Sequence, residues 1–239
     1  MTKQEKIKFA QKFISASWSC GEDIFSKREN LFIETEQVFF EIITFGCNAV
    51  IRADRNIIDW CVKEFTDTSF DLITDGENLH MIESKMREYG KKLGGEHLHF
   101  LRLITEGNLP KPQGFTFELY EREQVLELYQ DSRFDNALNY TAKNEILAIV
   151  AKAGNDIAAV VASEDYRKGL CQLGVDTIHA YRGEGLAAYL VKEMALECEK
   201  RMAIPYYTTW SANIASMRTA LAAGFQPVWL EYYAEDMEN

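Results

Sequence analysis

The sequence lacks the apolar segments that membrane-spanning and secreted proteins carry. No apolar run among its 239 residues approaches the roughly 20 residues of a spanning helix, and the first residues, MTKQEKI, hold no apolar core of signal-peptide length. Low-complexity and Gly/Ser-rich runs are also missing, which argues against long disordered segments. With 47% hydrophobic residues available for a core, we predict a soluble, globular, cytoplasmic protein.

Positive charge and paired cysteines are scarce as well. There are 26 lysines and arginines against 37 acidic residues, and the formal net charge of -11 repels phosphate backbones and anionic lipids. We therefore expect neither nucleic acid nor a membrane as a partner. The five cysteines are scattered, odd in number and free of C-x-x-C spacing, so we interpret them as buried thiols. His97 and His99 have no third ligand nearby, and no metal is predicted.

Prolines and glycines concentrate at one place, residues 106–114 (EGNLPKPQG), which has the composition of a linker. Before it, the patterns predict helices over 7–14, 56–65 and 78–92 and strands over 31–35, 38–45, 49–53 and 98–103. The first three strands are expected to form a small antiparallel sheet. We predict an N-terminal α+β domain over residues 1–112 and a second domain over residues 113–239.

After the linker the elements alternate regularly. Gly154 and Asn155 supply the turn of a hairpin, and Gly224 ends the last helix as a left-handed terminator. The fold class is therefore mixed α+β. The patterns predict strands over 115–120, 146–153, 157–162, 169–178, 205–210 and 228–233 and helices over 121–129, 185–202 and 213–223.

The junction between the strand that ends at Ile178 and the helix from Gly185 carries the main chemical signal. A helix N-terminus leaves its first N–H groups unpaired and favours anions. Glycines at positions 183 and 185 let a phosphate approach the backbone. No Walker lysine follows Gly185, and the antiparallel hairpin before the loop is unlike a doubly wound dinucleotide fold. The sequence predicts a pyrophosphate-binding loop.

Residues from about 115 to 233 resemble the GNAT superfamily of acyl-CoA-dependent N-acetyltransferases. Its signature, Arg or Gln, two residues, Gly, one residue, then Gly or Ala, is matched by Arg182-Gly183-Glu184-Gly185-Leu186-Ala187. A second mark follows, Asn213-Ile214-Ala215-Ser216 and then Ala223-Gly224-Phe225. Residues 45–51 and 210–213 are similar to a GNAT subgroup that includes the zwittermicin A resistance acetyltransferase, which implies that the first domain is a companion covering the acceptor site.

The resemblance implies acetyl-CoA as cofactor and a central, mostly antiparallel sheet with flanking helices. Strands 169–178 and 206–210 would splay apart to admit the thioester. Backbone amides of residues 182–187 would hold the pyrophosphate, and Asn213 would touch the pantetheine arm, a role that competes with that of a helix N-cap. The predicted cofactor-binding residues are Val175, Asp176, Thr177, Arg182, Gly183, Glu184, Gly185, Leu186, Ala187 and Asn213.

Many members of the superfamily have a tyrosine seven residues after the asparagine, which acts as the general acid toward the departing thiolate. This chain has Ala220 at that position. The reaction implied is direct attack of a neutral primary amine of a small molecule on the thioester, which needs a proton acceptor. The sequence leaves open a non-catalytic acyl-CoA sensor, an acetyltransferase for protein or peptide amines, and a homodimer. The catalytic candidates are Asp176, Tyr181, Tyr207 and Ser216, and Glu145 and Asp165 flank the predicted sheet without matching the position of a superfamily base.

Overall fold

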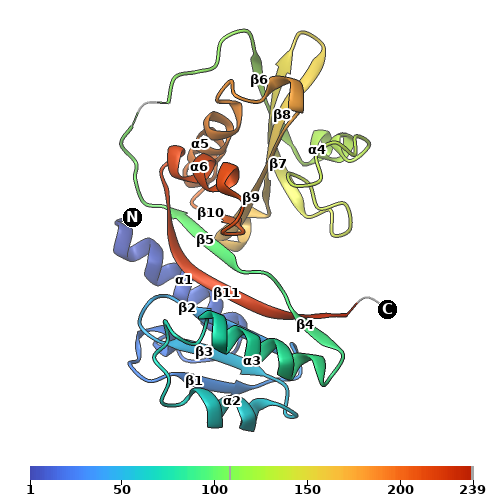
Figure 1. The fold of residues 1–239 in the computed structure, drawn as a ribbon. Helices are drawn as coiled ribbons and strands as arrows, with labels where there is room; N and C mark the ends of the chain where they lie inside the picture. The colour runs from blue at the N-terminus through green and yellow to red at the C-terminus, as the bar shows by residue number, and fades with distance from the viewer. Residues whose placement is uncertain (108, 238–239) are drawn as a thin grey trace. The chain divides into compact units, whose positions relative to one another are not determined.

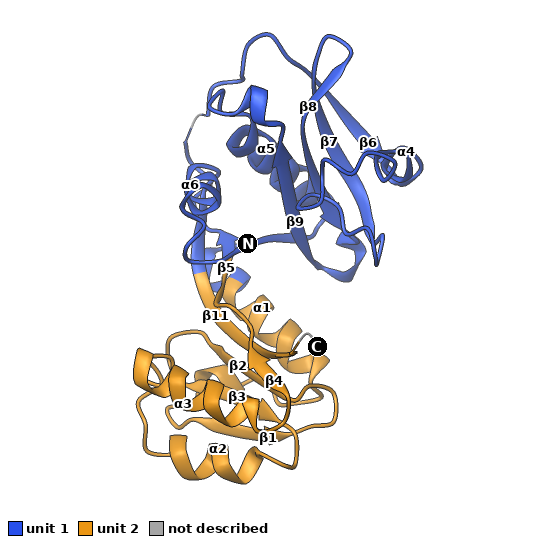
Figure 2. Cartoon of the chain, turned by 45° about the vertical axis from the view of Figure 1, so that its right-hand side comes forward, with its two compact units in different colours: residues 1–6, 100–227 blue, residues 7–99, 228–239 orange. Residues whose placement is uncertain are grey.

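The computed structural model describes residues 1–107 and 109–237, which form two compact units (Figure 2). Unit 1 comprises residues 1–6 and 100–227, and unit 2 comprises residues 7–99 and 228–239. Three elements pass along the chain from one unit into the other: α1 (Lys3–Ser17), β5 (His97–Arg102) and β11 (Phe225–Asp236). The predicted division at residues 112 and 113 concerns functional domains and stays a prediction. Residue 108 of the predicted linker lies outside the described residues.

Unit 1 holds the elements predicted after the linker, with β11 continuing into unit 2, and the structure confirms each of them to within three residues at either end. They are β6 (Thr116–Glu121), α4 (Arg122–Leu128), β7 (Glu145–Ala153), β8 (Asp156–Glu164), β9 (Leu170–Thr177), α5 (Leu186–Lys200), β10 (Ile204–Thr209) and α6 (Ile214–Ala222), with single 3-10 turns η2 (Tyr166–Lys168) and η3 (His179–Tyr181). β6, β7, β8 and β9 are antiparallel neighbours, and β10 joins β9 in parallel. The mixed α+β fold with a mostly antiparallel sheet is therefore confirmed.

The hairpin of β7 and β8 contributes side chains to both faces of the unit 1 sheet. It turns at Gly154 and Asn155, as predicted, because Ala153 pairs with Asp156 and Gly154 takes a φ of 62°. α4 lies on one face and α5 on the other (Figure 1). Successive strand residues point to opposite faces, so the alternating small and β-branched residues of the hairpin fill both layers. The α4 layer is formed by Val125, Leu128, Phe134, Ala137, Leu138, Ala148, Val150, Val160 and Ala162.

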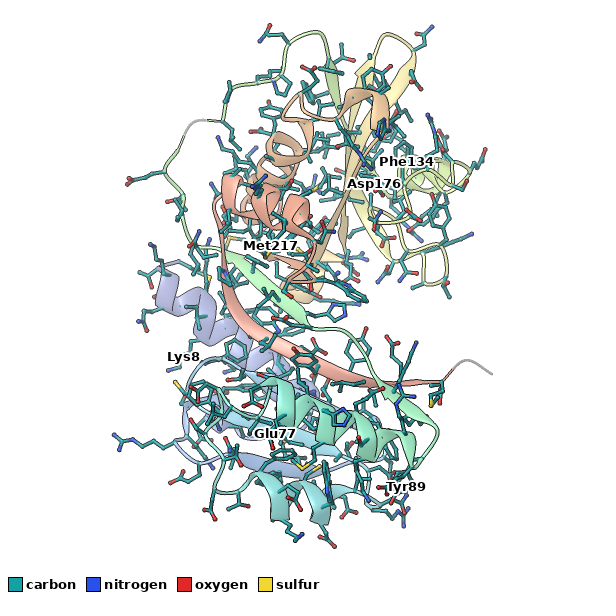
Figure 3. The ribbon with its side chains drawn as sticks, in the orientation of Figure 1. Lys8, Glu77, Tyr89, Phe134, Asp176 and Met217 are labelled. Carbon is teal, nitrogen blue, oxygen red and sulfur yellow. The ribbon has the colours of Figure 1, made fainter. Side chains whose placement is uncertain are left out.

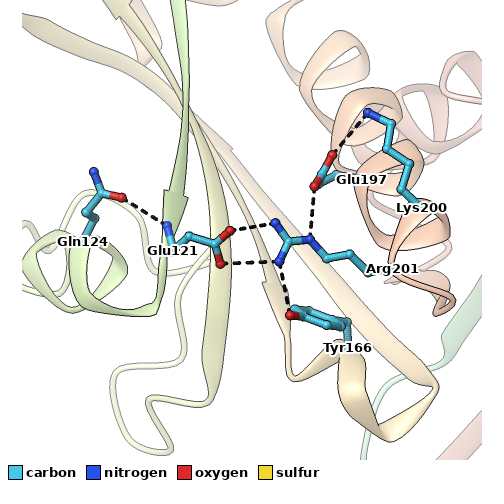
Figure 4. A network of polar contacts seen from close by, with 6 residues as sticks. All are labelled: Glu121, Gln124, Tyr166, Glu197, Lys200 and Arg201. Atoms are coloured by element: carbon cyan, nitrogen blue, oxygen red, sulfur yellow. Dashed lines mark hydrogen bonds and ion pairs between the residues drawn. The ribbon is translucent and has the colours of Figure 1, made fainter.

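A polar network at the C-terminal end of α5 fixes this helix to the rest of unit 1 (Figure 4). The Arg201 guanidinium lies 2.6 Å from Glu121, at the end of β6, and 3.0 Å from Glu197 on α5. It also donates to the Tyr166 hydroxyl at 3.1 Å. The hydrogen bond that Arg201 donates to the Glu121 carboxylate raises the pKa of Arg201, which keeps the guanidinium charged. The helix whose first turn forms the predicted phosphate loop is thus held at its far end.

Unit 2 is a second α+β unit with η1 (Ile24–Ser26), β1 (Leu31–Glu34), β2 (Phe40–Thr44), β3 (Ala49–Ala53), α2 (Ile58–Phe65), α3 (Gly76–Arg87) and β4 (Lys91–Leu93). Two predictions are corrected here. β1 runs parallel to β3, so the first three strands are not all antiparallel; residue alternation carries no strand direction, which the connections decide. The third helix ends at Arg87 because Gly90 takes a φ of 69°, and the residues after it form β4.

The cysteines depart in part from their prediction as buried thiols. Cys61, Cys171 and Cys198 are buried, whereas Cys47 is exposed and Cys20 is half-buried. Cys47 lies in the turn between β2 and β3, and Cys20 follows the end of α1, so both sit where the chain reverses at the surface. Within residues 1–107 and 109–237, no helix is long and apolar enough to cross a membrane.

A cluster of ionisable side chains is largely buried in unit 2. Arg52 on β3 lies 2.7 Å from Glu41 on β2, and His99 Nε2 lies 2.8 Å from Glu231 on β11. Glu41 and Glu231 share a hydrogen bond. Burial, and next the nearby Glu231 carboxylate, raise the pKa of Glu41 to about 7. Glu41 therefore keeps its proton at a pH where an ordinary glutamate is ionised.

We predict that unit 2 loses stability as the pH rises from about 5 to 8. A carboxyl whose pKa is higher in the folded than in the unfolded state stabilises the fold when protonated, and this contribution disappears as the pH rises through the folded pKa. A shift from 4.5 to about 7 corresponds to on the order of 3 kcal/mol. Urea unfolding followed by tryptophan fluorescence at both pH values should show the loss in the wild type and little of it in Glu41→Gln. An equal loss in both proteins would contradict the assignment.

Candidate active site

The loop between β9 and α5 is open on the side where a phosphate would enter. Gly183 and Gly185 take φ angles of 88° and 76°, which are strained for other residues. A Cβ built on either glycine would meet no atom within 4 Å. Gly185 is the N-cap of α5 and makes no side-chain cap bond, so the first N–H groups of the helix are left for a ligand. The predicted loop residues thus fit a pyrophosphate.

The side chains of this loop leave the backbone uncovered. Glu184 is exposed, as expected for an acidic residue in front of a helix N-terminus. Arg182 is also exposed and donates from Nε to the carbonyl of Thr177 at 3.2 Å, which ties the loop to the end of β9. Leu186 is buried under the first turn of α5, and Ala187 is half-buried. The contacts expected of these residues are therefore contacts of backbone amides.

β9 and β10 separate within unit 1. Their parallel pairing runs from Leu170 with Ile204 to Leu173 with Tyr207. Among the described residues, Gly174–Thr177 pair only with β8. The hydroxyls of Thr177 and Thr208 are buried without a hydrogen-bond partner. A strand edge with unpaired backbone groups accepts an extended, strand-like ligand, so Val175, Asp176 and Thr177 lie where a pantetheine arm fits.

The proposed acid and base candidates are each tied to a partner. The Tyr207 hydroxyl lies 2.8 Å from Ser216 Oγ, whereas Tyr181 donates to Asp156 at 3.2 Å. Burial raises the pKa of Tyr207, which keeps its phenol protonated. Asp165 pairs with Arg167 at 2.6 Å in the turn of η2. The structure brings Tyr207 and Ser216 together and leaves Tyr181 and Asp165 elsewhere.

Asn213, the residue before α6, fills one of the two roles predicted for it, that of a helix N-cap. Asn213 is the N-cap, and its Oδ1 accepts from the Ser216 backbone N–H at 3.1 Å. Ala220 is fully buried one turn after Ser216. Residues four apart share a helix face, so Ser216 lies on the face where the superfamily's tyrosine would stand. Contact of Asn213 with the pantetheine arm stays a prediction.

Asp176 fastens a loop to the sheet. Its carboxylate accepts from the backbone N–H groups of Asn136 and Ala137 and from the Asn136 side chain, all at 2.8 Å. Burial raises its pKa, and the Asn136 hydrogen bond opposes that rise. Figure 3 labels Asp176 on β9 and Phe134, which precedes the loop residues that Asp176 holds. A carboxylate with three donors is better suited to positioning the loop than to taking a proton from a substrate.

The loop held by Asp176 closes one side of a cavity of about 300 Å³ on the α4 face of unit 1. Its floor is the sheet, including Gly174 at the point where β9 leaves β10. A Cβ on Gly174 would lie 2.2 Å from the carbonyl of Asn136, so only glycine lets the loop approach β9 this closely. The cavity is lined by Asp135, Asn136, Ala137, Leu138, Asn139, Tyr140, Glu145, Ala162, Glu164, Gln172 and Gly174.

Sequence reasoning did not identify most of this lining. Asp135, Asn136 and Gln172 belong to no motif, and Glu145 was singled out only as a residue beside the sheet. One signal was available: a hairpin that turns at Gly154 and Asn155 places Glu145 opposite Glu164, and the structure confirms that pair. Like charges directly opposite each other on neighbouring strands are destabilising, so a pair of glutamates predicted at one register position was a reason to consider these two residues.

In this sheet β9 separates from its parallel neighbour β10 and then leads through a loop of left-handed glycines into α5. This arrangement is typical of acyl-CoA-binding transferases. The GNAT acetyltransferase family model matches residues 109–232. The chain therefore belongs to the GNAT acetyltransferase family and uses acetyl-CoA. Among curated proteins, none matches the chain.

Several solved structures are similar to this chain. A GCN5-related N-acetyltransferase-like protein from Streptococcus suis 89/1591 has 13% identity and a TM-score of 0.53, with 97% of this chain and 99% of that chain covered. An acetyltransferase from the GNAT family from Colwellia psychrerythraea has 14% identity and a TM-score of 0.45, with coverages of 60% and 57%. The aminoglycoside acetyltransferase AAC(6')-Ib in complex with coenzyme A has 12% identity and a TM-score of 0.36, with coverages of 49% and 93%.

Proposed function

We propose that this acetyltransferase acetylates a primary amine of a small cationic molecule bound in the cavity under the loop 135–140. One observation carries the proposal: the cavity places carboxylates of Asp135, Glu145 and Glu164 beside Gly174, where β9 and β10 separate. Within the part of the chain that the structure describes, none of the three forms an ion pair with a protein cation. Their negative charge therefore suits a ligand that is itself positively charged.

The residues that would hold acetyl-CoA have separate tasks. Backbone amides from Arg182 to Ala187 bind the pyrophosphate, and the edge formed by Val175, Asp176 and Thr177 orients the pantetheine arm toward Gly174. When bound, acetyl-CoA supplies an acetyl thioester, which an amine attacks directly. The Tyr207 and Ser216 hydroxyls, 2.8 Å apart, hold a proton on the α6 side of β10, opposite the cavity. We assign them the donor role that Ala220 cannot fill.

A volume of about 300 Å³ lies in the range of small-molecule pockets, which favours a small molecule over a protein side chain or N-terminus as the acceptor. Membership in the subgroup of the zwittermicin A resistance acetyltransferase is part of this proposal and rests on residues 45–51 and 210–213. The non-catalytic sensor remains the competing function, and the absence of a tyrosine at position 220 is the observation that favours it.

Thiol release from acetyl-CoA over a panel of amines tests the proposed function. We expect turnover with at least one of ethylamine, 1,4-diaminobutane, kanamycin and a lysine peptide, and the highest kcat/KM with a small cationic amine. N,N,N',N'-tetramethyl-1,4-diaminobutane, which keeps both charges but has no N–H to lose, is the matched control and should give no product. Tight binding of acetyl-CoA with no thiol release on any amine would favour the sensor, and preference for the peptide would exclude the cavity as acceptor site.

A further inference from the structure

Four polar side chains form a row across the α4 face of the unit 1 sheet. Glu145 on β7 pairs with Glu164 on β8, and Gln172 on β9 pairs with Tyr206 on β10. β8 and β9 are joined in register up to Ser163 with Leu173, so Glu164 comes next to Gln172. The Tyr206 hydroxyl donates to Gln172 Oε1 at 3.1 Å. The row therefore crosses the sheet just before the point at which β9 and β10 separate.

The two glutamates of the row differ in their partners. Glu145 is buried, and each of its oxygens accepts a hydrogen bond, Oε1 from the Asn139 N–H at 3.1 Å and Oε2 from the Tyr129 hydroxyl. Glu164 is half-buried, and its Oε1 accepts from Asn144 Nδ2 at 2.9 Å. In the described part of the chain, Oε2 of Glu164 has no hydrogen-bond partner. Glu145 is thus fixed, whereas Glu164 has an oxygen left for a ligand.

Of the two glutamates in the row, Glu164 lies nearer to the separated strands, because β8 is the direct neighbour of β9. Ala162, two residues before it on the same face, pairs directly with Gly174. Glu164 and Gly174 are therefore diagonal neighbours, which on adjacent strands lie about 7–8 Å apart. The Glu164 side chain can span this distance to a ligand beside Gly174 directly or through one water. The other ionisable groups facing this cavity are Asp135 and Tyr140 on the loop and Glu145 on β7, with Tyr206 on the neighbouring β10. None of them offers an unpaired carboxylate oxygen on the sheet.

We propose that Glu164 is the proton acceptor for the acceptor's ammonium group, an inference that rests on the proposed function. The ammonium enters the cavity charged, and one N–H proton moves from nitrogen to Glu164 Oε2, which leaves the nitrogen lone pair free and the carboxyl neutral. Water then takes this proton and restores the carboxylate. Glu145 lies next to it as a second carboxyl group, held in place by the Asn139 N–H and the Tyr129 hydroxyl. Asp176, already bound by three donors, is a positioning residue for the loop.

The test compares two amines of similar size that differ in protonation at neutral pH. Ethylamine is an ammonium ion there, whereas 2,2,2-trifluoroethylamine is largely neutral because its fluorines withdraw electrons. Glu164→Gln should lower kcat/KM for ethylamine about 100-fold or more, the range of general base catalysis, and that for trifluoroethylamine less than tenfold. Asp165→Asn is the matched control, because Asp165 is the next residue but pairs with Arg167 in a turn. It should change neither value by more than about twofold.

A binding measurement without acetyl-CoA provides a second readout. Calorimetry with 1,4-diaminobutane should show about tenfold weaker affinity for Glu164→Gln than for the wild type and no change for Asp165→Asn. Equal losses for both amines in the kinetic test, or unchanged diamine affinity in Glu164→Gln, would overturn the assignment to Glu164. No diamine binding to the wild type would overturn the cavity as the ammonium site. If either result were accompanied by thiol release from acetyl-CoA by the wild type with other amines, the proposed acetyl transfer would still hold, and only the assignment of Glu164 or of the cavity would fail.

Discussion

A tryptophan in place of Gly185 is expected to abolish measurable acetyl-CoA binding, with affinity reduced at least about 100-fold, while the protein stays folded. The indole would enter the open space in front of the α5 N-terminus, because no protein atom lies within 4 Å of a Cβ at this position. It would cover the N–H groups that a pyrophosphate needs. A 100-fold loss corresponds to about 2.7 kcal/mol of binding free energy. Calorimetry with acetyl-CoA and circular dichroism measure the two outcomes.

Gly154→Trp is the matched control for this variant. Gly154 also takes a positive φ, 62°, and a Cβ there also meets no atom within 4 Å, but it lies in the β7–β8 turn. Both substitutions place an L residue in the left-handed region at a cost of roughly 1–2 kcal/mol. We expect equal losses of stability and a loss of cofactor binding in Gly185→Trp alone. Unchanged affinity in a folded Gly185→Trp protein would rule out this loop as the pyrophosphate site.

Gly174→Ala is expected to disable the acceptor side of the site while acetyl-CoA still binds. The added methyl group would lie 2.2 Å from the Asn136 carbonyl, so the loop that Asp176 holds must move. Overpacking of this kind costs roughly 1–3 kcal/mol of unfolding free energy. Because the displaced loop lines the cavity, we expect kcat/KM for a cationic amine to fall about 100-fold or more. Steady-state kinetics with varied amine, and calorimetry with acetyl-CoA, separate the two sides.

Gly224→Ala controls for the loss of stability itself. A Cβ on Gly224 would also lie 2.2 Å from a carbonyl, that of Ile104, but neither residue lines the cavity. We expect a comparable or larger drop in unfolding free energy, since Gly224 also takes a φ of 89°, and a normal KM for the amine. A similar rise in amine KM in both variants would mean that Gly174 acts through overall stability and not through the loop 135–140.

Local signals in the sequence were sufficient to predict the helices and strands of unit 1. Gly183, Gly185 and Gly224 each occupy a positive φ that few other residues adopt, and the helices and strands around them follow the 3.6 and 2.0 periods of their apolar residues. The same reasoning failed where the information is not local. The direction of β1 depends on which strand it meets, which the residues of β1 alone do not encode.

The sequence by itself determined the family, the glycine loop in front of α5 and the missing tyrosine at Ala220, because each depends on a few neighbouring residues with distinctive backbone or side-chain chemistry. Only the tertiary structure assembled the acceptor cavity. Its carboxylates come from the loop at Asp135 and from two strands that meet at Glu145 and Glu164, and its floor from Gly174 on a third strand. Residues so far apart become neighbours through strand pairing and through the hydrogen bonds of Asp176, which no local pattern encodes.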